Sequence, residues 1–165
     1  MKFFFKKIIF FFLFISVSEA NNNLKFIDIN FIVNNSISGK NLNEIIEKKN
    51  KKVVSELNKI RDKLKIKKDK IVAQKNILKK DEYENEVKDF NEIKKKKTDE
   101  FNNFSINSKK KIIDLLNPLI TNYLKKESIQ ILLQKDKIIF GDDKLNITQD
   151  ILKLFDDKYK KIKFE

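Results

Sequence analysis

The chain has 165 residues, of which 37 are basic and 24 acidic, so its formal net charge is +13. It contains neither cysteine nor histidine, which excludes disulfides, the usual zinc sites, and Ser-His or Cys-His catalysis. We therefore expect a protein that is not an enzyme and has no cofactor or metal site. Every basic residue except Arg61 is lysine, and A/T-rich codons encode Lys, Asn, Ile and Phe alike. Codon bias and selection therefore both remain open as explanations of the charge.

Residues 1–20 have the pattern of a signal peptide. A basic start, MKFFFKK, precedes a mainly apolar run over residues 8–17, and Ser18 and Ala20 place small residues at a cleavage spacing. An uncleaved membrane anchor is the alternative, but spanning a bilayer takes about 20 apolar residues, roughly twice this run. We predict cleavage after Ala20 and export. Export makes nucleic acid an improbable partner.

The residues after the cleavage site predict a strand, a short helix and a break. Residues 24–28 are rich in apolar and aromatic side chains and short enough for a strand. Residues 29–36 can form one or two helical turns. Gly39, one of two glycines, is then expected to break the helix.

A heptad pattern begins near residue 41 and predicts two long helices. Apolar residues recur at a/d spacing in each half of this region, and acidic residues after position 80 suit the start of a new helix. We expect the helices to fold back on each other near 77–81 as an arm of roughly 50 Å. The first seam holds Ile46, Val53, Leu57, Ile60, Leu64, Ile71 and Leu78, and the second Tyr83, Val87, Phe90, Phe101, Phe104 and Leu115.

One layer of this predicted arm has too much charge. If residues 78 and 83 face each other, Lys67 meets Lys94, and Lys97 lies opposite Leu64. Two lysines cannot pack as apolar knobs, so this layer must be open, shifted or wet, and we expect the arm to bend there as a hinge. A small helix rotation that brings Ile66 and Ile93 into the seam is the alternative.

The rest of the chain predicts a second set of short elements. Pro118 should kink or end the returning helix near Asn117. The segments SIQILLQ and KIIF predict a β-hairpin joined through residues 134–137, and Thr148 is a good N-cap for a last helix. The first strand should complete the sheet that this helix covers. The fold class is therefore α+β, with a small sheet body built from both chain ends and a protruding antiparallel helical hairpin.

This arrangement resembles the Skp/OmpH family of periplasmic chaperones across essentially the whole mature chain. The segment FIDINFIVNNSISGK is similar to that family's opening strand, Asp, short helix, Ser and Gly-Lys. NPLI is similar to its proline near the base of the returning helix, and IIFGDDKLNITQDIL to its strand, loop and last helix. Asn146 replaces the usual Asp and Phe140 a common Tyr. The positions that match are Asp28, Ser36, Gly39, Lys40, Asn117–Ile120, Phe140 and Thr148.

The resemblance implies a homotrimer whose sheets form a β-barrel body and whose arms enclose unfolded outer-membrane proteins, without ATP. It implies a periplasmic holdase, with a signal peptide over 1–20, a trimerisation body over 21–40 and 118–165, and an arm over 41–117. An anionic membrane surface is a further possible partner. The alternative is a structural coiled-coil envelope protein that binds no client. Expected client contacts are Val54, Ile66, Val72, Ile77, Ile93 and Ile106; the expected body core is Leu24, Phe26, Ile131, Leu133, Ile139, Phe140, Ile151, Leu152 and Phe155.

Overall fold

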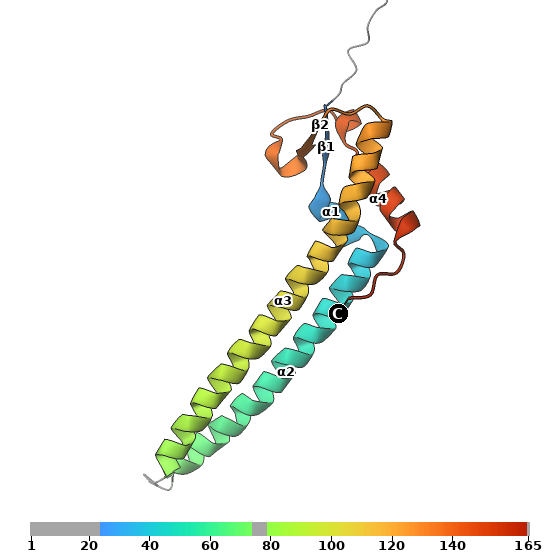
Figure 1. Cartoon of the computed structure of the whole chain (residues 1–165). Helices are drawn as coiled ribbons and strands as arrows, with labels where there is room; N and C mark the ends of the chain where they lie inside the picture. Colours follow the sequence, from blue (N-terminus) through green and yellow to red (C-terminus); the bar gives the residue numbers. More distant parts are fainter. Residues whose placement is uncertain (1–23, 74–78, 165) are drawn as a thin grey trace, which may run out of the picture.

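The computed structural model describes residues 24–73 and 79–164. Two long helices form an arm that leads away from a body made by both ends of this range (Figure 1). The expected signal peptide and residues 74–78, including Ile77, lie outside the described residues. In chain order the elements are β1 (Leu24–Ile27), α1 (Ile29–Asn35), α2 (Ile37–Ala73), α3 (Lys80–Lys126), β2 (Ile131–Gln134) and α4 (Thr148–Lys158), with 3-10 turns at Lys135–Lys137 and Asp143–Leu145.

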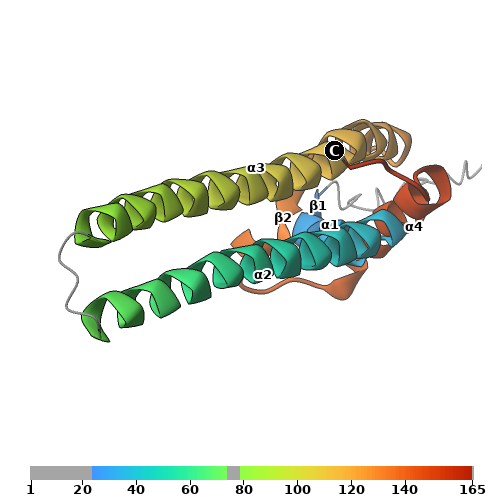
Figure 2. The same cartoon turned by 90° about the horizontal axis from the view of Figure 1, so that it is seen from below.

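The arm consists of α2 and α3, which lie side by side in both views (Figures 1 and 2). The long helices predicted by the heptads are confirmed. The seam residues within the described range are buried or half-buried, and the new helix begins with Asp81 and Glu82 in its first turn, where negative charge stabilises the helix dipole. Within residues 24–73 and 79–164, no helix is both long enough and apolar enough to cross a membrane.

The predicted helix break at Gly39 is wrong, and so is the predicted helix end at Pro118, whereas a kink there stays a prediction. The break between α1 and α2 lies at Ser36, and Gly39 is already inside α2 because the Ser36 hydroxyl accepts a hydrogen bond from its N–H. Helix α3 also continues through Pro118 to Lys126. Pro118 removes only the bond to the carbonyl of Asp114, an exposed residue where water can take the donor's place.

The body holds a two-stranded parallel sheet. Strands β1 and β2 pair with Leu24 opposite Ile131, so the prediction of a sheet drawn from both ends of the chain is confirmed. On the other side of β1, the N–H of Ile147 donates to the carbonyl of Phe26 at 2.9 Å. β1 is therefore flanked on both sides, whereas the second edge of β2 pairs with nothing in the described residues.

The predicted β-hairpin after residue 128 is wrong in its second half. β2 forms, but a 3-10 turn follows it at Lys135–Lys137, and residues 138–140 form no strand. These residues cannot pair with β1 either, because β2 and the segment at Ile147 already occupy its two edges.

The core lies where α1, α4 and the base of the arm meet. Helix α4 packs mainly against α1 and α3. Strand β1 contributes Ile27 to the same cluster, and Leu132 of β2 packs against it. The ten buried members are Ile27, Ile32, Val33, Leu42, Ile112, Leu116, Ile120, Ile147, Ile151 and Phe155. The body is thus held together mainly by helix packing.

Candidate functional site

Exposed apolar side chains are spread along the arm. Val54, Ile66, Val72, Ile93 and Ile106 are between 38% and 68% exposed. At 3.6 residues per turn, Val54 and Val72 lie on the same side of α2, about five turns apart, while Ile66 points about 120° away from them. In the described part of the arm, the exposed apolar residues thus do not share one stripe. They are available as separate contacts on a surface otherwise rich in lysine.

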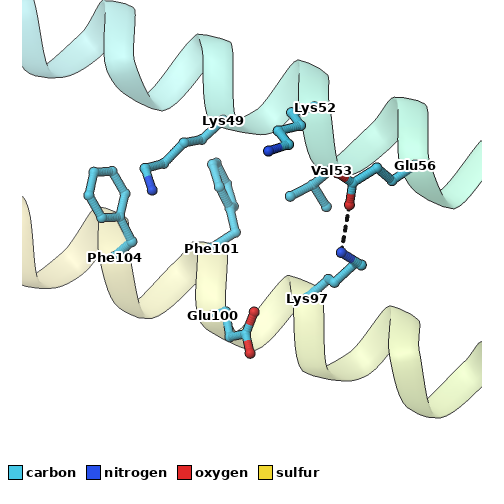
Figure 3. A pocket seen from close by; sticks show the side chains of 8 residues that line it. All are labelled: Lys49, Lys52, Val53, Glu56, Lys97, Glu100, Phe101 and Phe104. Carbon is cyan, nitrogen blue, oxygen red and sulfur yellow. Dashed lines mark hydrogen bonds and ion pairs between the residues drawn. The ribbon is translucent and has the colours of Figure 1, made fainter. Parts of the chain in front are cut away.

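The seam between α2 and α3 contains a mixed aromatic and charged pocket (Figure 3). Its space is about 230 Å³ and its walls include Val53 and Phe101. The Lys49 amino group lies over the Phe104 ring, 4.3 Å from its centroid, in cation–π geometry. Lys97 Nζ donates to Glu56 Oε2 at 2.6 Å and joins the two helices.

A second cross-arm cluster forms around Lys67. Its Nζ donates to Glu82 Oε1 at 2.8 Å and to Glu86 Oε1 at 2.7 Å. The hydrogen bonds to Glu82 and then Glu86 raise the pKa of Lys67, and the bond from Lys67 lowers the pKa of Glu82. In the same way, the bond to Glu56 raises the pKa of Lys97. These ion pairs tie α2 to α3.

The predicted layer of like charges is therefore wrong. Lys67 faces acidic residues of α3, Lys97 pairs with Glu56 rather than lying opposite Leu64, and Lys94 is exposed. The helix register differs from the one assumed, because residue 67 lies near 86 and residue 56 near 97. The heptads alone did not determine this offset.

The alternative of a rotated helix is wrong as well. Ile66 is 57% exposed and does not enter the seam. Leu64, which is buried, fills this level, beside a cleft of about 310 Å³ that Phe90 and Ile93 also line. The true register could have been found in the sequence by choosing the offset between the helices that places Lys67 opposite Glu86 and Lys97 opposite Glu56.

The expected body residues divide into two groups. Phe26, Ile151 and Phe155 are buried and Leu152 is half-buried. The others are exposed to different degrees in the isolated chain. Leu24, Ile131 and Leu133 are 36–51% exposed along the strands, and Ile139 and Phe140 are almost fully exposed.

Thr148 has a different role from the cap we predicted. It is the first residue of α4, and its hydroxyl accepts a hydrogen bond from the Asp28 N–H at 2.8 Å instead of capping its own helix. The start of α4 is instead capped by the Asn146 carboxamide oxygen, which accepts a hydrogen bond from the Thr148 N–H at 3.0 Å. Thr148 thus joins the end of β1 to the start of α4, while the Asp28 carboxylate caps α1 through the N–H of Phe31.

The segment that follows α4 was not predicted from the sequence. Tyr159, Ile162 and Phe164 pack against the core cluster and alternate with exposed lysines, a pattern visible in KIKF. The ion pair between Glu56 and Lys97 was not predicted from the sequence either. Across residues 24–73 and 79–164, no group of His, Cys, Asp and Glu side chains could hold a metal ion.

Comparison with known proteins gives two positive findings. Residues 23–155 match the model of a family described as outer membrane protein (OmpH-like). The chain is also similar in structure to a proposed outer membrane chaperone (OmpH-like) from Caulobacter crescentus CB15, with a TM-score of 0.65. The two chains share 16% identity over 87% of this chain and 89% of the other, which shows a common fold. No curated protein matches the sequence.

Proposed function

Because the chain belongs to the OmpH-like outer membrane protein family, we propose that it is an ATP-independent holdase chaperone for unfolded outer-membrane proteins. The observation that carries this proposal is the set of separate exposed Val and Ile side chains along two long helices. A holdase must bind many sequences weakly and release them when folding in the membrane is more favourable. Scattered apolar contacts meet that need, because each is weak and several arms together gain from multivalency.

We propose that client segments contact Val54, Ile66, Val72, Ile93 and Ile106, and also Ile77, which lies outside the described residues. The cationic surface supplies a second, long-range attraction. Residues 41–80 contain 14 basic and 5 acidic side chains. Such a surface attracts acidic client segments and anionic membrane surfaces alike, and salt should weaken both attractions.

Assembly into a homotrimer is part of the proposal. The free edge of β2 and the exposed side chains of Ile139 and Phe140 favour pairing with other copies of the chain. In such a trimer the strands would form a barrel body from residues 21–40 and 118–165, and the antiparallel hairpins over 41–117 would enclose the client. A body this small gains stability by burying its exposed strands.

The proposed location is the periplasm, reached after cleavage of the signal peptide behind Ala20. Amino-terminal sequencing of the exported protein tests the cleavage site. A mature chain that begins at Asn21 is the expected result, and a chain that keeps residues 1–20 would point to a membrane-anchored form.

Aggregation of an unfolded β-barrel protein diluted out of urea tests the function. Light scattering should stay low when the mature chain is present. A Val54→Ser, Ile66→Ser, Ile106→Ser variant should protect the client several-fold less well, because it loses apolar contacts. The matched control is Asn50→Ser, Asn103→Ser, Asn107→Ser, which alters exposed uncharged positions on the same helices. If the unmodified chain leaves aggregation unchanged, the protein is a structural coiled-coil envelope component instead.

A further inference from the structure

The segment after α4 lies beyond the part of the chain that matches the family model. The match ends at residue 155, whereas residues 159–164 continue beyond α4 without regular secondary structure. In both views this segment leaves α4 and runs beside the base of the arm (Figures 1 and 2). We call residues 159–164 the strap. The match to the family model does not include the strap.

The strap contacts both helices of the arm. Tyr159 carries the first contact: its ring packs on Phe155 at 5.2 Å between centroids, and its carbonyl accepts a hydrogen bond from the Ser38 hydroxyl in the first turn of α2. The carbonyl of Lys163 accepts from Lys111 Nζ of α3 at 2.9 Å. Ile162 and Phe164 pack against the buried core cluster, while the lysines between them are exposed.

The start of α2 depends on the same region of the chain. A single residue, Ser36, separates α2 from α1, and the first N–H groups of a helix have no partner within it. Asp156 near the end of α4 accepts from the N–H of Ile37 at 2.8 Å, and Ser36 accepts from Gly39 at 3.0 Å. Two successive residues of α2, Ile37 and Ser38, are thus bound to α4 and the strap.

We propose that the strap fixes the base of the arm to the body and so sets the direction of the arm. Without it, the first turn of α2 loses its hydrogen bond to Tyr159, and the base of α3 loses the bond at Lys111. The α2 side of the arm would then be free to pivot about Ser36, and α3, which is continuous with the body, could bend near Pro118, where one backbone hydrogen bond is missing. The direction of the arm would determine how wide a space the arms enclose in the proposed trimer, but the strap itself does not depend on client binding.

Amide hydrogen exchange on the full chain tests the strap. In an Ile162→Ser, Phe164→Ser variant, exchange should become several-fold faster in residues 37–45 and 108–116 and stay unchanged in 56–70 and 82–97. Lys160→Ser, Lys161→Ser is the matched control, because these exposed lysines belong to the same segment. Equal exchange at the arm base in both variants would overturn the proposal. Should the double variant fail to fold, Ser38→Ala removes one strap bond and should give the same localised increase.

Spin labels test the direction of the arm. The chain has no cysteine, so labels attached at Lys65→Cys and Lys135→Cys report one distance between arm and body. Labelled chains are refolded with an excess of unlabelled chains to isolate distances within one copy. The distance distribution should be narrow in the unmodified background and broader in the Ile162→Ser, Phe164→Ser background. A distribution of unchanged width would limit the strap to local stability and overturn its role in arm direction. No client is present, so these results are independent of holdase activity.

Discussion

Gly39 shows how one missing side chain determines the junction between α1 and α2. A Cβ at this position would lie 2.8 Å from the Val33 carbonyl carbon and 2.9 Å from Ser36 Oγ, and it would also clash with the Val33 oxygen. The backbones of the two helices therefore approach each other more closely than any larger residue permits. The glycine that we expected to break a helix instead allows α2 to start beside α1.

We predict that Gly39→Ala lowers the free energy of unfolding by about 1–3 kcal/mol, although alanine normally favours a helix. Urea denaturation at fixed protein concentration measures the change. Gly141→Ala is the control, because its Cβ would lie 3.4 Å from Ile138 and Phe26 side-chain atoms, a distance that small side-chain shifts accommodate. Equal stability losses in the two variants would mean that the contact with Val33 does not determine the junction.

Tyr123 gives the fold a dependence on alkaline pH. Burial, and then the hydrogen bond to Asp150 at 3.0 Å, raise the pKa of Tyr123 to about 12. Because an unfolded tyrosine titrates near pH 10, the folded state binds the proton more tightly. The stabilising contribution is therefore complete below about pH 10 and is lost as pH rises toward 12.

Tyr123→Phe should remove this part of the pH dependence. The free energy of unfolding is measured at about pH 9 and about pH 11 for both proteins, and the difference between them cancels the titration of lysines. The unmodified protein should lose more stability than the variant over this interval. Identical losses would show that the phenol does not stay protonated in the folded state.

At the scale of elements, the cross-arm ion pairs determine how α2 and α3 are aligned. Heptads repeat every seven residues, so the apolar seams accept several offsets between the helices. Lys67 with Glu82 and Glu86, and Glu56 with Lys97, favour one of them. Solvent-screened pairs of this kind add little to stability, but they are enough to bias the choice between registers that the apolar seams accept equally well.

We predict that Lys67→Met speeds amide exchange in residues 80–90, because α3 loses both bonds that hold its first turns to α2. Lys94→Met is the control at an exposed position and should leave exchange unchanged. Slower exchange in the Lys67 variant would instead mean that an apolar side chain packs better at this level than the ion pairs do.

The sequence predicted the long helices, the first strand and the short helix after it, because apolar periodicity depends only on neighbours along the chain. It did not predict the register of the arm, which depends on pairs such as Glu56 and Lys97 that lie far apart in the chain. The helix through Pro118 escaped prediction for another reason. Packing of Leu116 and Ile120 in the core outweighs the loss of one hydrogen bond on an exposed side.

At the scale of the whole molecule, the exposed residues at the edge of the body should control assembly. We predict that Ile139→Ser, Phe140→Ser converts the proposed trimer to a monomer, because both side chains are fully exposed in the isolated chain and would be buried between copies. Light scattering measures the mass. Val54→Ser, Ile106→Ser on the arm is the control and should leave the mass unchanged. If the Ile139→Ser, Phe140→Ser variant keeps the mass of the unmodified protein, the interface between copies lies elsewhere.

The pairing of β1 with elements near the other end of the chain has a consequence for the order of folding. Its partners, β2 and the segment at Ile147, are made more than a hundred residues later. Helices form from local contacts within microseconds, whereas β1 must wait during synthesis until the chain has been made as far as Ile147. Because α2 and α3 lie between β1 and β2 in the chain, packing of these two helices brings the strands together, and the body is completed last. Until then β1 is an unpaired apolar strand, so this chain is itself prone to aggregation during its own synthesis.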